Sequence, residues 1–119
     1  MSVTNILDED IQAAEFLPEW FETKSKIIMA RVCKEYGITM KQIRQRTKKK
    51  KIVIPRRVSM YLMSTVMKSN LMSIAQAHGF TDHVNTMNAL KAIEKAMIAS
   101  ETFSELVEGL TDEVRELIK

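Results

Sequence analysis

Four neighbouring residues have the side-chain chemistry needed to recognise nucleic-acid bases. They are Asp82, Val84, Asn85 and Asn88. Asparagine can form a paired hydrogen bond with adenine, aspartate can accept one from the amino group of cytosine, and valine can contact a thymine methyl group. Simpler roles also fit two of them, because Val84 could belong to an apolar core stripe and Asp82 could cap a helix N-terminus. For Asp82, capping and base recognition are compatible.

A second group of residues carries the charge needed to bind phosphates: Arg46, Lys48, Lys49, Lys50, Lys51, Arg56 and Arg57. Residues 24–57 hold thirteen Lys or Arg and one acid, whereas residues 1–23 hold six acids and no base. So basic a segment, in a chain of net charge +3, is typical of proteins that bind a polyanion. The run at 46–51, called here the basic loop, could instead be a solvated loop or a localisation-like tract. We favour contact with the DNA backbone or minor groove, because phosphates would relieve its internal repulsion.

The sequence gives little support for catalysis or metal binding. It contains no glycine-rich phosphate-binding loop, so an ATPase module is not expected. Cys33, His78 and His83 lack the spacing of metal ligands, and the nine methionines are best explained as core residues. We therefore predict that the protein is not an enzyme and uses no cofactor or metal.

Length and composition restrict the fold. At 119 residues the chain is large enough for one hydrophobic core. It contains 3 glycines and 2 prolines and shows little strand-like alternation, which predicts an all-α class. No apolar run reaches the length of a membrane span, and the acidic N-terminus does not resemble a signal peptide. We expect a soluble protein.

A helix-turn-helix is predicted over residues 71–98, and it would carry the base-recognising group. A short apolar segment ends at His78-Gly79, and Thr81-Asp82 then offers capping oxygens to a second helix. The second helix has a predicted apolar stripe made of Val84, Met87, Leu90, Ile93 and Met97. In DNA-binding proteins of this type the second helix lies in the major groove.

A central core helix is predicted over residues 55–68 and would carry part of the basic group. Pro55 would stand in its first turn, where a missing N–H needs no partner. Arg56 and Arg57 would then lie at the helix N-terminus, which also favours anions.

The remaining predicted elements flank these two. Further helices are expected over residues 24–36, over 40–45 and from about residue 100 to the end. Gly37 would end the first and Thr39 would cap the second. The last helix has an acidic outer side, which suits core cover or a protein-binding surface.

Residues 1–23 are interpreted as an acidic N-terminal extension, and residues 24–119 as the helical domain. Trp20 and Phe21 are expected to pack on the domain rather than to bind a ligand. The extension is best explained as a solvated arm. The alternative is a DNA mimic that folds against the basic segment.

From about Lys26 to Leu110 the chain resembles the C-terminal, DNA-binding domain of the bacterial chromosomal replication initiator DnaA. The shared features keep the family's order and spacing: Tyr36-x-Ile38, the basic loop, Pro55-Arg56, Met60 and Leu62, Leu71-x-x-Ile74, Gly79, Asp82-His83, Ala89 and Ile93-Glu94. The family signature is an acidic-histidine pair, two threonines and a histidine-alanine pair. Half of this signature is present.

The resemblance implies a domain of about six helices, of the DnaA C-terminal or Trp-repressor-like type, that binds duplex DNA at a short specific box. It implies that Asp82 and His83 are the base-reading pair in the major groove. It places Lys48 at the position of an arginine that enters the minor groove, and Arg56 at an arginine beside the proline.

Four residues depart from the family pattern. The two threonines are replaced by Val84 and Asn85, the later histidine by Asn88, and the basic residue before the aspartate by Thr81. These replacements remove contacts to phosphates and bases. We therefore do not expect the chain to recognise the family's standard box.

We interpret the chain as a stand-alone protein that binds double-stranded DNA with sequence preference and regulates replication initiation or transcription. It would be cytoplasmic and nucleoid-associated, with no membrane partner. The alternative is a protein-interaction module that keeps the fold and binds a protein through the acidic N-terminus or the last helix. A structured-RNA binder is less favoured, because a recognition helix cannot enter the deep, narrow major groove of A-form RNA.

Overall fold

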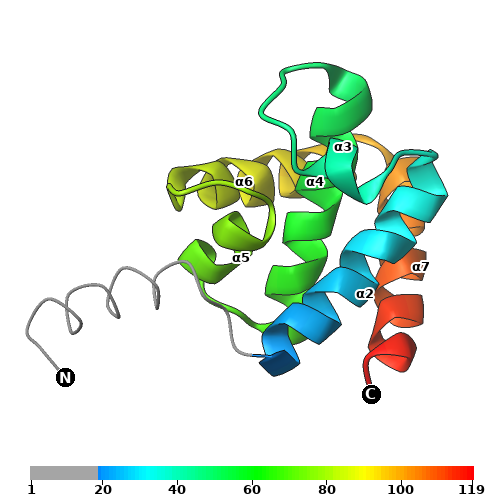
Figure 1. Ribbon diagram of the computed structural model, residues 1–119. Helices are drawn as coiled ribbons and strands as arrows, with labels where there is room; N and C mark the ends of the chain where they lie inside the picture. Colours follow the sequence, from blue (N-terminus) through cyan, green and yellow to red (C-terminus); the bar gives the residue numbers. More distant parts are fainter. Residues whose placement is uncertain (1–18) are drawn as a thin grey trace, which may run out of the picture.

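The computed structural model describes residues 19–119, which form six α-helices and one π-helical segment, with no β-strand among them (Figure 1). The predicted all-α class is confirmed. The elements are α2 (Glu19–Tyr36), α3 (Met40–Ile43), α4 (Lys50–Leu62), the π-helical segment η1 (Met63–Met67), α5 (Leu71–Ala77), α6 (Val84–Ala99) and α7 (Glu101–Leu117). No helix in this part of the chain is long and apolar enough to cross a membrane.

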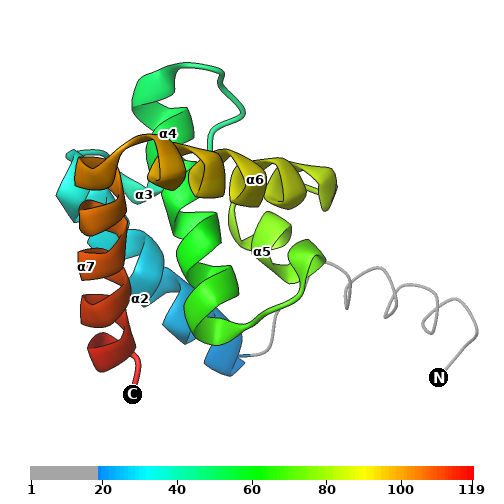
Figure 2. The same cartoon turned by 180° about the vertical axis from the view of Figure 1, so that it is seen from behind.

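Helix α4 runs through the middle of the molecule, with α2 and α7 on one side and α5 and α6 on the other (Figures 1 and 2). Val58, Met60 and Leu62 on this helix are almost completely buried. A helix that is surrounded by others must be apolar on most of its surface, and this explains its composition. The predicted central core helix is confirmed in this region.

The start of α4 differs from the prediction. The helix begins at Lys50, and Pro55 lies inside it rather than in its first turn. Pro55 cannot donate to the carbonyl of Lys51, but this residue is exposed, so water can replace the single lost hydrogen bond. Lys50 and Lys51 therefore belong to the first turn of the helix. Arg56 and Arg57 belong to the second turn, and their predicted place at the helix N-terminus was wrong.

The helix predicted from Lys24 begins earlier, at Glu19. Phe21 is 2% exposed and joins the core, as predicted, whereas Trp20 is 58% exposed and meets Phe21 edge-on with ring centres 5.9 Å apart. The helix ends at Gly37, whose φ of +67° suits glycine. The predicted acidic extension falls mostly on residues 1–18, which lie outside the described residues.

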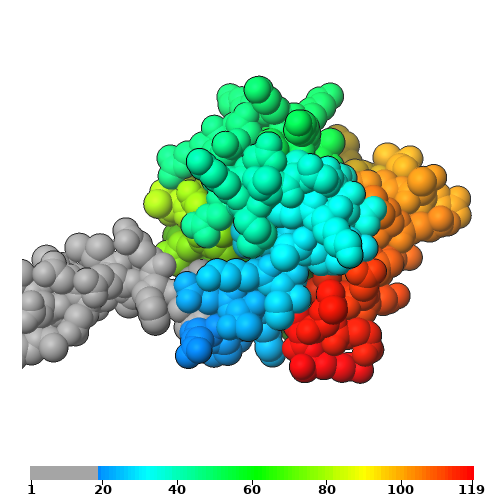
Figure 3. Space-filling model, turned by 45° about the vertical axis from the view of Figure 1, so that its right-hand side comes forward, coloured from blue at the N-terminus to red at the C-terminus, as the bar shows by residue number. Residues whose placement is uncertain are grey.

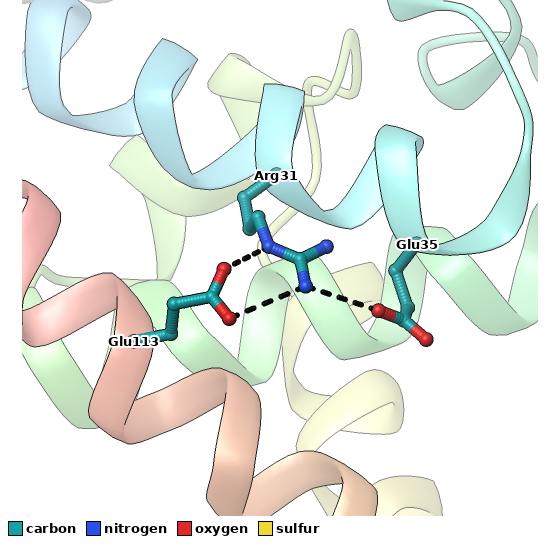
Figure 4. A network of polar contacts seen from close by, with 3 residues as sticks. All are labelled: Arg31, Glu35 and Glu113. Atoms are coloured by element: carbon teal, nitrogen blue, oxygen red, sulfur yellow. Dashed lines mark hydrogen bonds and ion pairs between the residues drawn. The ribbon is translucent and has the colours of Figure 1, made fainter.

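Helices α2 and α7 are joined by an ion-pair network as well as by core contacts (Figure 4). Arg31 on α2 donates through Nε and Nη2 to Glu113 on α7, and through Nη2 to Glu35 at 3.1 Å. The hydrogen bonds from Arg31 lower the pKa of the Glu113 carboxyl group. The acids on the outer side of α7 are exposed, as predicted: Glu101, Glu105, Glu108, Asp112, Glu113 and Glu116.

Candidate nucleic-acid interface

Helices α5 and α6 are joined through a tight turn at Gly79, which confirms the predicted helix-turn-helix. Gly79 has a φ of +85°, a conformation that glycine adopts without strain. The turn is closed by the N–H of Phe80, which donates to the carbonyl of Ala75 at 2.9 Å. A Cβ atom on Gly79 would lie 3.0 Å from the carbonyl oxygen of Arg44. Glycine is therefore also required by the close approach of the segment that follows α3.

The buried face of α6 differs from the predicted stripe. Thr86, Ala89 and Ile93 are the buried residues of this helix. The hydroxyl of Thr86 donates to the carbonyl of Leu71 at 2.9 Å and fixes α6 against the start of α5. Val84 is 43% exposed, so the simpler alternative considered for it, a place in the core stripe, does not hold. The observed buried face differs from the predicted one because threonine can occupy a core position when its hydroxyl group has a hydrogen-bond partner.

The predicted base-recognising residues lie at the N-terminus of α6. Asp82, His83, Val84 and Asn88 are exposed, and Asn85 is half-buried. Oδ1 of Asp82 accepts the N–H of Val84 at 2.8 Å, so Asp82 is the capping residue and Thr81 is not. The amide nitrogen of Asn85 donates to the carbonyl of Asp82 at 3.3 Å. Asp82, Asn85 and Asn88 each keep a side-chain oxygen that no hydrogen bond in residues 19–119 uses.

The five cations of the basic loop are all exposed: Arg46, Lys48, Lys49, Lys50 and Lys51. The loop and the first turn of α4 project from one end of the molecule (Figures 1 to 3), and α6 lies beside this end (Figures 1 and 2). The ion pairs formed within residues 19–119 include none of these cations. The first turn of α4 has no acid and no side-chain cap. Because a helix N-terminus is itself electropositive, the first turn of α4 adds to the positive charge of the loop.

Arg56 is engaged by the protein itself. Its Nη1 donates to the carbonyl of Gln45 at 2.6 Å and its Nη2 to the carbonyl of Thr47 at 3.3 Å. The guanidinium carbon lies 4.8 Å from the centre of the Phe80 ring. Burial, and then the neighbouring charge of Arg57, lower the pKa of Arg56.

The structure brings the basic loop close to the base-recognising segment, the name used here for residues 82–88. Arg57 lies apart from both. The guanidinium carbon of Arg46 lies 5.8 Å from the ring of Phe80, two residues before Asp82. Arg57 is half-buried and lines an apolar hollow of about 400 Å³ between α4, α6 and α7, with Ile54 and Phe103 among its other lining residues.

Residues 25–93, more than half of the chain, match the model of the family described as the bacterial DnaA protein helix-turn-helix. The chain belongs to this family. The matched range begins in α2 and ends in α6, so it contains the basic loop, α5, the turn and the first part of α6.

Several DnaA proteins resemble the chain. It is 28% identical over 102 residues to the chromosomal replication initiator DnaA of Bdellovibrio bacteriovorus, covering 82% of this chain and 22% of the relative. The DnaA of Chlorobaculum tepidum is 34% identical over 79 residues, covering 66% of this chain and 16% of the relative. A solved DnaA bound to AMPPCP and single-stranded DNA superposes with a TM-score of 0.75 at 25% identity, covering 83% of this chain and 30% of that chain. A solved DNA replication initiation factor superposes with a TM-score of 0.76 at 23% identity, covering 93% of this chain and 32% of that chain. At this identity the likeness shows the fold alone. The chain thus spans about a fifth of the curated relatives.

Sequence reasoning missed three residues that shape this DnaA-type helix-turn-helix: Thr86, His78 and Phe80. His78 is fully buried, with Nδ1 2.8 Å from the carbonyl of Ile74 and Nε2 2.7 Å from the hydroxyl of Ser59. Because a carbonyl can only accept, Nδ1 carries the proton and Nε2 accepts from Ser59. Burial lowers the pKa of His78 to about 4, so it is neutral at pH 7. In the sequence, the feature that could have pointed to this role of His78 is its position next to the turn glycine, Gly79.

Metal coordination finds no support in the part of the chain described. Residues 19–119 contain no group of three or more His, Cys, Asp or Glu placed to hold a metal ion. Nδ1 of His83 lies 3.7 Å from Oδ1 of Asp82, so these two side chains face each other at the start of α6.

Proposed function

We propose that this DnaA-type helix-turn-helix binds double-stranded DNA with sequence preference and acts as a regulator of replication initiation or transcription. The observation that carries the proposal is the contact between Arg46 and Phe80, which makes the basic loop and the base-recognising segment neighbours. A duplex presents phosphates and base edges side by side, so a DNA-binding surface needs both kinds of group together.

The basic loop supplies the affinity in this proposal. Five exposed cations and the electropositive N-terminus of α4 attract phosphates and hold the protein on the duplex. Lys48 enters the minor groove. Arg57 contacts the backbone weakly at most, because it is half-buried beside the far half of α6.

The N-terminal turn of α6 supplies the sequence preference. Asn85 and Asn88 form paired hydrogen bonds with adenine, Asp82 accepts from cytosine, and the exposed Val84 meets a thymine methyl group. His83 acts beside Asp82 as the second member of the base-reading pair. Each such contact discriminates between bases by about 1–3 kcal/mol.

The regulatory role is inferred from the family of the matched region. The chain aligns with the helix-turn-helix of replication initiators that are several times longer. A chain with this domain can occupy initiator-like sites and so influence what binds there. In the cell it would be bound to the nucleoid.

The decisive test is selection of bound duplexes from a random pool, followed by the double variant N85A/N88A on the selected sequence. We expect wild type to prefer the selected duplex over random duplex, and the variant to lose that preference while binding random DNA as before. The matched control is E94A/K95A, which changes two exposed residues further along the same helix. Retained preference in N85A/N88A would show that the assigned readout is wrong.

The same measurements separate the proposal from a protein-interaction module. If the wild-type protein binds no duplex even at low salt, the DNA-binding function fails. The acidic outer side of α7 would then be the first surface to test for a protein partner.

A further inference from the structure

The turn of the helix-turn-helix is in direct contact with the segment that begins the basic loop. Gly79 approaches the carbonyl of Arg44 so closely that a Cβ atom would be only 3.0 Å from it. The next residue, Phe80, is half-buried and lies beneath the guanidinium groups of both Arg46 and Arg56. The contacts of Gly79 with Arg44 and of Phe80 with Arg46 join two segments that lie more than thirty residues apart in the chain.

Arg56 is the residue that completes this junction. It reaches from the second turn of α4 and donates hydrogen bonds to the carbonyls of Gln45 and Thr47, the residues on either side of Arg46. Its guanidinium carbon lies over the Phe80 ring, 4.8 Å from the ring centre. Arginine is suited to this role, because its planar group can donate at its edge while it stacks on an aromatic ring.

We propose that Arg56 and Phe80 form a clamp that fixes the basic loop relative to the N-terminus of α6, and that Arg56 is a positioning residue rather than a phosphate ligand. The consequence for binding rests on the proposed DNA-binding function. The clamp itself does not, because its contacts lie within the protein.

The loop needs such a clamp for an electrostatic reason. Five like charges at 46–51 repel one another, and the ion pairs of the described region do not neutralise them. A loop that is held in place before binding loses less conformational freedom when phosphates arrive, so the clamp raises affinity without touching DNA. It also fixes the spacing between backbone contacts and base contacts.

The clamp predicts a result opposite to that of direct phosphate contact. Removing a phosphate ligand reduces the steepness with which affinity falls with salt, by about 0.9 per contact. Loss of a positioning contact lowers affinity at every salt concentration and leaves that steepness unchanged. Phe80 carries no charge, so the substitutions at Phe80 and Arg56 should have the same effect only if the clamp exists.

The first experiment measures tryptic cleavage of the protein without DNA. F80L keeps an apolar side chain but removes the ring face, R56K keeps the charge but not the two-carbonyl geometry, and R56Q removes both. We expect each variant to be cut faster after Arg46, Lys48 and Lys49, by about two- to fivefold, the factor that an exposed cation–π contact represents. K95Q, which changes an exposed cation on α6, should be cut at the wild-type rate.

The second experiment measures the affinity of the same variants for random duplex at several salt concentrations. We expect F80L and R56Q to weaken binding by similar factors with an unchanged salt slope, and F80L/R56Q to be no weaker than the weaker single variant. Thermal melting identifies any variant that is simply unfolded at the assay temperature, in which case R56K provides the comparison.

Two outcomes would overturn the clamp. The first is wild-type cleavage of the loop in folded F80L and R56K. The second is a salt slope reduced by about one in R56Q but not in F80L, which would make Arg56 a phosphate ligand. If wild type binds no DNA while the variants are cut faster, the clamp stands and the proposed function fails.

Discussion

Neutralising Lys48–Lys51 should remove most of the salt dependence of DNA binding. The basic loop presents five exposed cations, of which these four lysines are consecutive. If each of the five neutralises one phosphate, the logarithm of the association constant falls with the logarithm of salt concentration with a slope of about −4.5. Between 50 and 200 mM salt, this slope corresponds to an affinity loss of about 500-fold.

The variant K48Q/K49Q/K50Q/K51Q leaves Arg46 as the remaining cation of the loop. Its slope should be about −0.9, so the same change in salt should weaken binding only about fourfold. The ratio of affinities for selected and random duplexes should change little, because the base-recognising residues are untouched. Fluorescence anisotropy with a labelled duplex at four or more salt concentrations measures both quantities.

A charge-matched control separates a local effect from a general one. K24Q/K26Q/K34Q/K95Q removes the same number of charges from α2 and α6, outside the loop. We expect this control to keep a slope close to that of wild type. A slope change below about one in the loop variant, or an equal change in the control, would refute the assignment of the phosphate contacts to the basic loop.

Two further predictions concern the helix-turn-helix itself. The pKa of His78 is about 4 in the folded protein against an ordinary value of 6.5, so unfolding takes up a proton as the pH falls from 6.5 toward 4, and stability decreases. Urea denaturation should show a loss of about 2 kcal/mol between pH 7 and pH 5, and H78Q should lack this part of the pH dependence; an equal dependence in H78Q would contradict the assignment. Replacing Thr86 by valine removes the hydrogen bond to Leu71 and should cost about 1 kcal/mol. Thermal melting against T102V, an exposed control on α7, tests this; equal melting temperatures for T86V and T102V would contradict it.

The parts of the fold that the sequence predicted well are those with a local cause. Gly37 and Gly79 both have positive φ, and both were identified as ends of helices. Thr39 was expected to cap a short helix, and it forms a complete capping box with Gln42. In each case the deciding interaction is made within three or four residues, so neighbouring sequence contains the necessary information.

The errors arose where distant contacts decide the outcome. Proline is usual at a helix start, but α4 extends before Pro55 because Ile52 is buried in the core and holds the preceding turn. Arg56 was assigned to phosphate because of its charge, and this assignment stays a prediction. Its partners within the protein, the carbonyls at 45 and 47 and the ring of Phe80, are separated from it by nine or more residues, so no local pattern reveals them.

Helix α6 shows why the family fold can persist while the residues at its recognition positions change. Thr86, Ala89 and Ile93 hold the helix against the domain, and they occupy one face. Three of the four departures from the family pattern, Val84, Asn85 and Asn88, lie on the same helix outside this face, and none of the three is buried. Substitutions there cost little stability, because exposed positions of a helix tolerate most side chains. In the proposed readout, the fold and the recognised sequence are therefore specified by different faces of one helix, so sequence preference can diverge without loss of the domain.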